Sequence, residues 1–115
     1  MKKYDEIIRT RPNEAQGYVG KAHYLIKLGR YDDALKPLDK AARLDPRDAE
    51  VHFRMGYCFS MLNRQKEALA AYNNSLQLKQ TDQVCYNIAN TLSLLGKYDD
   101  ALRYYEHTLK INPKY

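Results

Sequence analysis

The sequence predicts an all-α protein, an α-solenoid of antiparallel helix pairs, and three observations lead to that prediction. The stretch LGRYDDAL, residues 28–35, returns as LGKYDDAL at residues 95–102. A looser copy, LNRQKEAL, starts at residue 62, so the interval of 67 residues divides into steps of 34 and 33. Apolar residues on both sides of each copy recur with helical spacing. Because one helix pair cannot bury its apolar stripe alone, units of this length must stack.

The chain divides into one incomplete and three complete units, which together form a single domain over residues 1–115. Residues 1–14 predict the last helix of an earlier unit, because Pro12 stands 34 residues before Pro46, which closes the next unit. The three complete units cover residues 15–48, 49–81 and 82–115.

Each helix boundary in the first complete unit has a recognisable signal. Gly29 ends the first helix, because glycine tolerates the left-handed conformation that follows many helices. Asp32 and Asp33 fall in the first turn of the second helix, where carboxylates interact favourably with the helix dipole. Pro46 ends that helix, since the residue before a proline is pushed out of the helical region. Pro37 conflicts with the pattern, because it removes a backbone hydrogen bond and favours a bend unless the helix starts as late as Asp33.

The middle unit is the least regular of the three. It has Asn63 where the other units have glycine, Gln65 where they have tyrosine, and Gln80 where they have proline. Its connection to the last unit is also one residue shorter. We therefore expect the angle between repeats to change at that connection.

This period and residue pattern resemble the tetratricopeptide repeat family over about the whole chain. The matching positions are a small residue in the first helix, a large one three residues later, the turn glycine, the tyrosine after it, an alanine in the second helix and a closing proline: Ala22, Gly56 and Ala89; Leu25, Phe59 and Leu92; Gly29 and Gly96; Tyr31 and Tyr98; Ala34, Ala68 and Ala101; Pro46 and Pro113. His52 and Cys85 depart from the bulky hydrophobe usual in the family. The resemblance implies a right-handed solenoid whose first helices line a concave face that binds proteins or peptides.

Side chains that face inward on the first helices and vary between units are the candidates for ligand contact. They are His23, Lys27, Phe53, Arg54, Tyr57, Tyr86, Asn87 and Asn90. Aromatic rings offer flat apolar area, cations attract carboxylates, and asparagine can pair with an extended peptide backbone. We therefore predict that the concave groove binds a peptide or protein segment, acidic or amphipathic. In the competing interpretation, the aromatic rings pack on neighbouring helices and the polar side chains are solvated.

One mode of binding in that family is not expected. Its co-chaperone members clamp a C-terminal carboxylate with Lys, Asn and Arg side chains on successive first helices. The positions that match this clamp hold Val19, His23, Arg54, Gln83 and Asn87, so the set is incomplete.

Charge and composition argue against other classes of function. The net charge is +5, from 19 basic and 14 acidic residues, and the excess is spread along the chain, which disfavours nucleic-acid binding. No apolar run reaches the length of a signal peptide or a membrane span, so we expect a cytoplasmic protein without membrane insertion. Cys58 and Cys85 have no metal-ligand spacing to the histidines and predict buried, reduced thiols. We expect no enzymatic activity, metal or cofactor, since no catalytic motif is present.

Two alternatives to a groove-binding module stay open. Leu102, Tyr105 and Leu109 lie on the last helix, where no following unit would cover them, so the chain could self-assemble as a homo-oligomeric scaffold. The same pattern is expected if the chain is a piece of a longer array.

Overall fold

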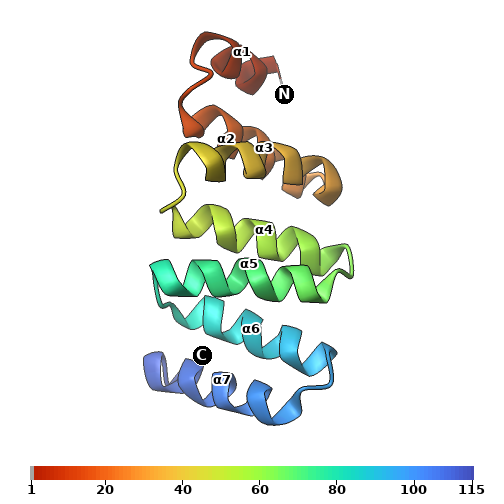
Figure 1. Ribbon diagram of the computed structural model, residues 1–115, viewed down its shortest axis with the longest axis vertical. Coiled ribbons are helices and arrows are strands. Elements are labelled where there is room, and N and C mark those ends of the chain that lie inside the picture. The colour runs from red at the N-terminus through yellow and green to blue at the C-terminus, as the bar shows by residue number, and fades with distance from the viewer. Residues whose placement is uncertain (1) are drawn as a thin grey trace.

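The computed structural model describes residues 2–115, and in that range it contains seven helices stacked in chain order (Figure 1). The helices are α1 (Lys2–Thr10), α2 (Ala15–Lys27), α3 (Tyr31–Leu44), α4 (Ala49–Met61), α5 (Gln65–Leu78), α6 (Asp82–Leu94) and α7 (Tyr98–Ile111). The stack is elongated, 47 × 24 × 23 Å, with α1 at one end and α7 at the other. The predicted fold class is confirmed. Met1, the first residue of the predicted partial helix, lies outside the described residues.

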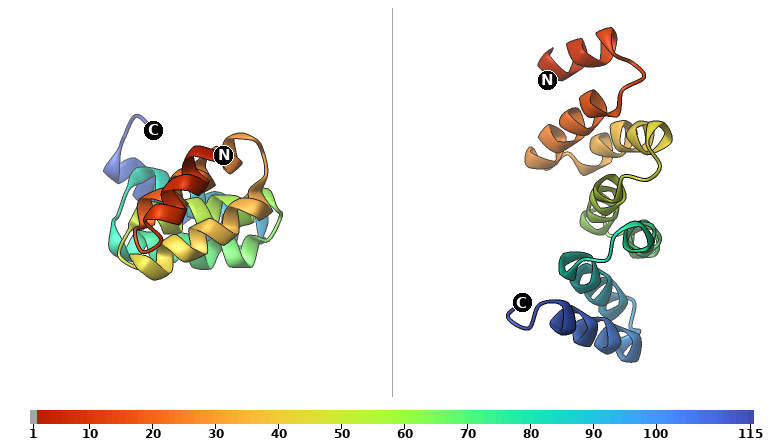
Figure 2. Two further views of the ribbon diagram at one scale, coloured as in Figure 1. Left: turned by 90° about the horizontal axis from the view of Figure 1, so that it is seen from above. Right: turned by 90° about the vertical axis from the view of Figure 1, so that its left-hand side faces the viewer.

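The helices form antiparallel pairs, α2 with α3, α4 with α5 and α6 with α7. Each second helix also contacts the first helix of the next pair, and α1 packs on α2. Seen along the middle helices, α3 and α5 lie on one side of the stack, and α2, α4 and α6 lie on the other (Figure 2). The first helices therefore share one face of the molecule.

The three turns within pairs have the same backbone geometry. Gly29, Asn63 and Gly96 all have a left-handed backbone, with φ of 75°, 60° and 80°. In each turn the following N–H bonds back to the helix, as Arg64 N–H does to the Phe59 carbonyl at 2.8 Å. This closing pattern is the one that glycine usually supplies at helix ends. Asparagine is the other residue that commonly tolerates a positive φ, which explains how the middle unit keeps the turn without glycine.

Pro37 does not end the helix that contains it. Helix α3 starts at Tyr31, not as late as Asp33, and continues through Pro37 to Leu44. The Pro37 ring is buried. The missing N–H breaks one bond of the helix ladder, but the burial of the ring offsets that loss.

Gly56 allows α4 and α5 to approach closely. The buried ring of Tyr72 on α5 occupies the space beside it, so that a Cβ at position 56 would lie 2.6 Å from Tyr72 Cδ1. The same ring packs against Phe53 with centroids 5.6 Å apart. This contact fixes the position of α4, which carries three of the candidate residues.

Candidate functional site

A hollow of about 350 Å³ crosses the shared face of the first helices. Its lining comes from three helices: Ile26 from α2; Glu50, Phe53, Arg54 and Tyr57 from α4; Gln83 and Asn87 from α6. Four of the eight candidate residues therefore meet in one place. Helical spacing also places Ile26, Glu50 and Gln83 on the inward faces of their helices, but they were not among the eight candidates.

Arg54 lies at the centre of this hollow and is held by two neighbours. Its Nη1 donates to His23 Nδ1 at 2.7 Å, and its Nη2 lies 3.2 Å from Glu50 Oε1. The Arg54 side chain is only 26% exposed, while that of Glu50 is 60% exposed. The Nε of Arg54 is buried and has no hydrogen-bond partner in the described chain. The guanidinium is therefore fixed in direction and keeps one donor that nothing satisfies.

His23 is held in its neutral form by this arrangement. Burial is the largest cause that lowers its pKa, and the positive charges of Arg54 and Lys27 lower it further, against a smaller opposing effect of Glu50. Since Nδ1 accepts from Arg54, the ring proton is on Nε2. Lys27 lies exposed at the end of α2, one helical turn after His23. At neutral pH the positive charge of this region thus comes from Arg54 and Lys27.

Phe53 and Tyr57 each contribute to both the core and the surface. Phe53 is half-buried against the Tyr72 ring. Tyr57 is 38% exposed and contacts Tyr31 edge-on, with centroids 5.9 Å apart. The two interpretations of these rings, packing and ligand contact, are compatible, because packing fixes each ring while part of its surface remains in the hollow.

Two other candidates lie in a different place, next to α7. Tyr86 packs against Tyr105 and Tyr115, with ring centroids 5.8 and 5.0 Å away, beside a separate hollow of about 130 Å³. Asn90 accepts a hydrogen bond from the Tyr105 hydroxyl. Tyr105 is therefore half-buried within its own repeat, and neither Tyr86 nor Asn90 lines the hollow around Arg54.

A second hollow continues the first toward the edge of the stack. It measures about 490 Å³ and shares Glu50, Phe53 and Gln83 with the first. Four more charged side chains line it: Arg47, Asp48 and Lys79 from the loops, and Asp82 from the first turn of α6. The two hollows adjoin at Glu50, Phe53 and Gln83, and we call them together the α4 groove.

The two ends of the stack differ in polarity. On α7, Leu102 is 57% and Leu109 is 50% exposed. Leu35 and Leu69 occupy the same repeat position as Leu102, and both are partly buried against the core. On α1, by contrast, the exposed side chains include the charged residues Lys2, Glu6 and Arg9, while Asp5 pairs with Lys21 of α2 at 2.7 Å.

Other kinds of site find no support in the described part of the chain. Residues 2–115 contain no group of three or more His, Cys, Asp or Glu side chains placed to hold a metal ion. None of the helices in that range is long and apolar enough to cross a membrane. Cys58 and Cys85 are free and buried, as predicted.

Comparison with known proteins gives consistent matches along the chain. Residues 19–82 and residues 83–115 each match a family profile described as Tetratricopeptide repeat. BBSome complex member BBS4 of Bos taurus is 26% identical over 93 residues, covering 81% of this chain and 18% of that protein. An Hsp70-Hsp90 organizing protein of Triticum aestivum is 27% identical over 94 residues, or 81% of this chain and 16% of that protein. The human protein O-mannosyl-transferase TMTC1 is 32% identical over 76% of this chain and 10% of its own length.

Solved structures with the same fold agree with these matches. The crystal structure of MamA superposes with a TM-score of 0.92 at 23% identity, covering 96% of this chain and 65% of that chain. A thermophilic TPR protein of Thermus thermophilus superposes with a TM-score of 0.84 at 24% identity, covering 98% and 64%. The chain thus spans less than a fifth of the curated relatives described above and about two thirds of these solved structures.

Proposed function

The chain belongs to the tetratricopeptide repeat family, and on that premise we propose that it is a non-enzymatic protein-interaction module that binds an extended peptide segment in the α4 groove. The observation that carries the proposal is Arg54, a guanidinium that lines the groove, is still 26% exposed and is held in direction by His23 and Glu50. A cation fixed in this way is already oriented for a ligand that carries a carboxylate.

The chemistry around Arg54 indicates a ligand that carries a carboxylate. Arg54 and Lys27 are cations, and Glu50 offsets one of them, so one positive charge remains while His23 is neutral. A hydrogen bond from a fixed guanidinium to a carboxylate contributes about 1.5–3 kcal/mol, or about 10- to 150-fold in affinity. Tyr57 offers a partly exposed ring beside it for an apolar side chain.

The groove has room for several extended residues. A peptide that crosses from the hollow around Arg54 over Phe53 into the second hollow would meet the amide of Gln83 and the carboxylates of Asp48 and Asp82. We infer that the ligand places its acidic residue near Arg54 and polar or basic residues farther along. The two free thiols suit a reducing compartment, which supports our expectation of a cytoplasmic protein.

The proposal is tested by affinity capture from a lysate of the source organism. The double variant Arg54→Glu with Tyr57→Ala should lose the partners that the wild type captures, because it reverses the central charge and removes the exposed ring. Arg43→Glu is the matched control, since Arg43 is an exposed arginine on α3 that pairs only with Asp39 in the described chain. If the double variant keeps its helical content and still captures the same partners, the assignment of the binding site to the α4 groove is wrong.

A second candidate function, self-association through α7, is favoured by the exposure of Leu102 and Leu109. The matching residues in the earlier repeats are partly buried against the core, so this face is suited to pack against another apolar surface. The exposed charged side chains of α1 offer no apolar partner for it, which disfavours head-to-tail stacking. We infer a tail-to-tail dimer through α7.

Light scattering over a dilution series tests that dimer. The mass should fall from dimer to monomer on dilution, and Leu102→Glu should be monomeric throughout. A strict monomer at the highest concentration rules out self-association. It would leave this face to a following helix of a longer array.

A further inference from the structure

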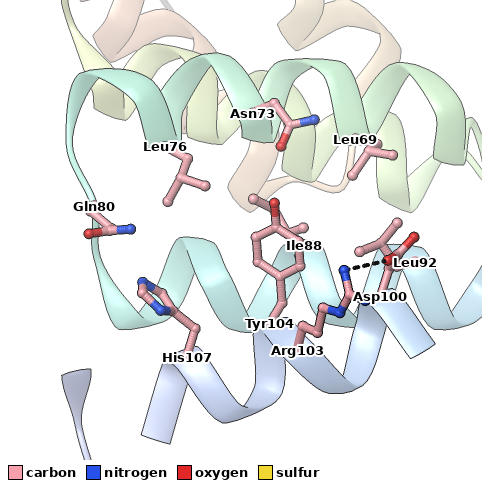
Figure 3. A pocket seen from close by; sticks show the side chains of 10 residues that line it. All are labelled: Leu69, Asn73, Leu76, Gln80, Ile88, Leu92, Asp100, Arg103, Tyr104 and His107. Atoms are coloured by element: carbon pink, nitrogen blue, oxygen red, sulfur yellow. Dashed lines mark ion pairs between the residues drawn. The ribbon is translucent and has the colours of Figure 1, made fainter. Parts of the chain in front are cut away.

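A second groove lies on the other side of the stack, between the second helices α5 and α7 (Figure 3). It measures about 560 Å³, and α6 forms its floor. The lining side chains are Leu69, Asn73 and Leu76 on α5, Gln80 after it, Ile88 and Leu92 on α6, and Asp100, Arg103, Tyr104 and His107 on α7. We call it the α5–α7 groove. Helix α6 contributes Ile88 and Leu92 to this groove, whereas it contributes Gln83 and Asn87 to the hollow around Arg54.

One lining residue of this groove differs in size between repeats. Tyr104 occupies the repeat position that Ala71, which is 5% exposed, occupies on α5. Figure 3 shows that the Tyr104 ring points from α7 toward α5, with its hydroxyl end near Asn73. The ring stands between side chains of the lining and divides them into two halves.

Each half of the groove combines apolar side chains with a polar group. Leu76 and His107 lie on one side of the Tyr104 ring, and Leu69 and Arg103 lie on the other. His107 Nε2 is buried and has no hydrogen-bond partner in the described chain. The His107 ring, which lines the groove, therefore brings a polar group to the half that contains Leu76.

The groove has little net charge. Its charged side chains, apart from His107, are Arg103 and Asp100, which lie 3.8 Å apart and form an ion pair. Asn73 and Gln80 add amides, each of which both donates and accepts. A peptide backbone carries N–H and C=O groups in alternation, and can satisfy such amides as well as His107 in either tautomer.

We propose that the α5–α7 groove binds a second, extended peptide segment that is uncharged and aliphatic. Alternate side chains of a strand point the same way, so two aliphatic residues at i and i+2 can enter the two halves on either side of Tyr104. A helical ligand fits less well, because a helix is about 10–12 Å across. The Tyr104 ring, which stands in the groove, would keep such a helix away from the apolar floor. This ligand differs in charge from the acidic one proposed for the α4 groove, so the two sites can be tested separately.

The test is a titration of the uniformly ¹⁵N-labelled chain, followed by NMR, with a capped hexapeptide that alternates valine and serine. We expect shift changes to saturate in residues 69–80 and 100–107 and to leave Arg54 and Tyr57 unaffected. The blocking variant Asn73→Trp should weaken binding at least tenfold, because its indole fills the groove. Asn74→Trp is the matched control, since Asn74 is the exposed neighbour of the half-buried Asn73. His107→Leu should also weaken binding while it leaves the chain folded.

Three results would overturn the proposal. One is the absence of shift changes in α5 and α7 at millimolar peptide. Another is equal binding by the two tryptophan variants. The third is a set of changes at the groove residues Asn73, Leu76 and His107 that follows protein concentration without peptide, which would assign the groove to a second copy of the chain. Concentration-dependent changes confined to Leu102 and Leu109 would instead report the dimer through α7. Loss of the α4 groove through Arg54→Glu should not affect this titration, so failure of one site is distinguishable from failure of the other.

Discussion

Replacement of Gly56 by alanine should destabilise the protein only while Tyr72 is present. The new Cβ would lie 2.6 Å from Cδ1 and 2.7 Å from Cε1 of a ring that is 2% exposed. Ordinary carbon contacts are about 3.5–4.0 Å, so about 1 Å must be gained by moving α4 away from α5. Overpacking of this kind costs about 1–3 kcal/mol, and the better helix propensity of alanine returns about 1 kcal/mol. We therefore expect a net loss of about 1 kcal/mol.

The same substitution should stabilise the protein when Tyr72→Ala has removed the ring. The steric cost then disappears, and the helix propensity alone gives a gain of about 1 kcal/mol. The coupling between the two positions is thus about 2 kcal/mol. Tyr72→Ala alone costs about 3–5 kcal/mol, which is a large share of a typical domain's stability, so the cycle is best measured in a stabilising osmolyte.

Urea unfolding followed by circular dichroism measures all four members of this cycle. Gly29→Ala is the control, because it is costly through its φ of 75° and has no atom within 4 Å of the added Cβ. Its effect should be the same with and without Tyr72. An effect of Gly56→Ala that is equally independent of Tyr72 would refute the claim that this contact fixes the position of α4.

Three further predictions concern individual side chains. The pKa of His23 is lowered in the folded state from its ordinary value of 6.5, so the unfolded chain binds more protons below that pH. The free energy of unfolding should therefore fall as the pH drops below about 6.5. Urea titrations at pH 7 and pH 5 should show a smaller loss of this free energy for His23→Gln than for the wild type. Burial raises the pKa of Cys58 to about 11 and also raises that of Cys85. A chromogenic disulfide reagent at pH 8 should therefore react slowly with the native protein and rapidly with the protein unfolded in urea. A fast reaction with the native protein would contradict the burial of the two thiols. Ser75→Ala should cost about 1 kcal/mol in urea unfolding, because it removes the buried bond from Ser75 Oγ to the Ala49 carbonyl at 2.8 Å.

The fold was predictable because the sequence pattern of the turn between paired helices occurs three times. The turn between the helices of each pair is marked by Gly29 and Gly96 and by the alanine that follows each of them. Asn63 adopts the same left-handed backbone in the middle pair. Pro37 was harder to predict, since its effect depends on the neighbours that bury its ring. Local sequence carries no information about those neighbours.

The candidate site was predictable in part for the same reason. Helical spacing selects a face, and it correctly grouped Phe53, Arg54 and Tyr57 on α4. It does not show which side chains on that face are already engaged. Tyr86 and Asn90 lie next to Tyr105 and form contacts there that span different helices. The α5–α7 groove was missed because its lining comes from three helices, and the spacing along one helix does not show which side chains of the others lie beside it.

The central claim is that the face around Arg54 contacts the natural partner, and site-specific photocrosslinking tests it most directly. A photoreactive phenylalanine derivative replaces Tyr57 in one variant and Tyr98, an exposed tyrosine on α7, in another. Both retain an aromatic ring, and neither requires that the partner be known. After irradiation in a lysate, we expect the variant at position 57 to form a discrete crosslinked protein that is lost when Arg54→Glu is added. Crosslinks from position 98 alone, or crosslinks from position 57 that persist with Arg54→Glu, would contradict the account.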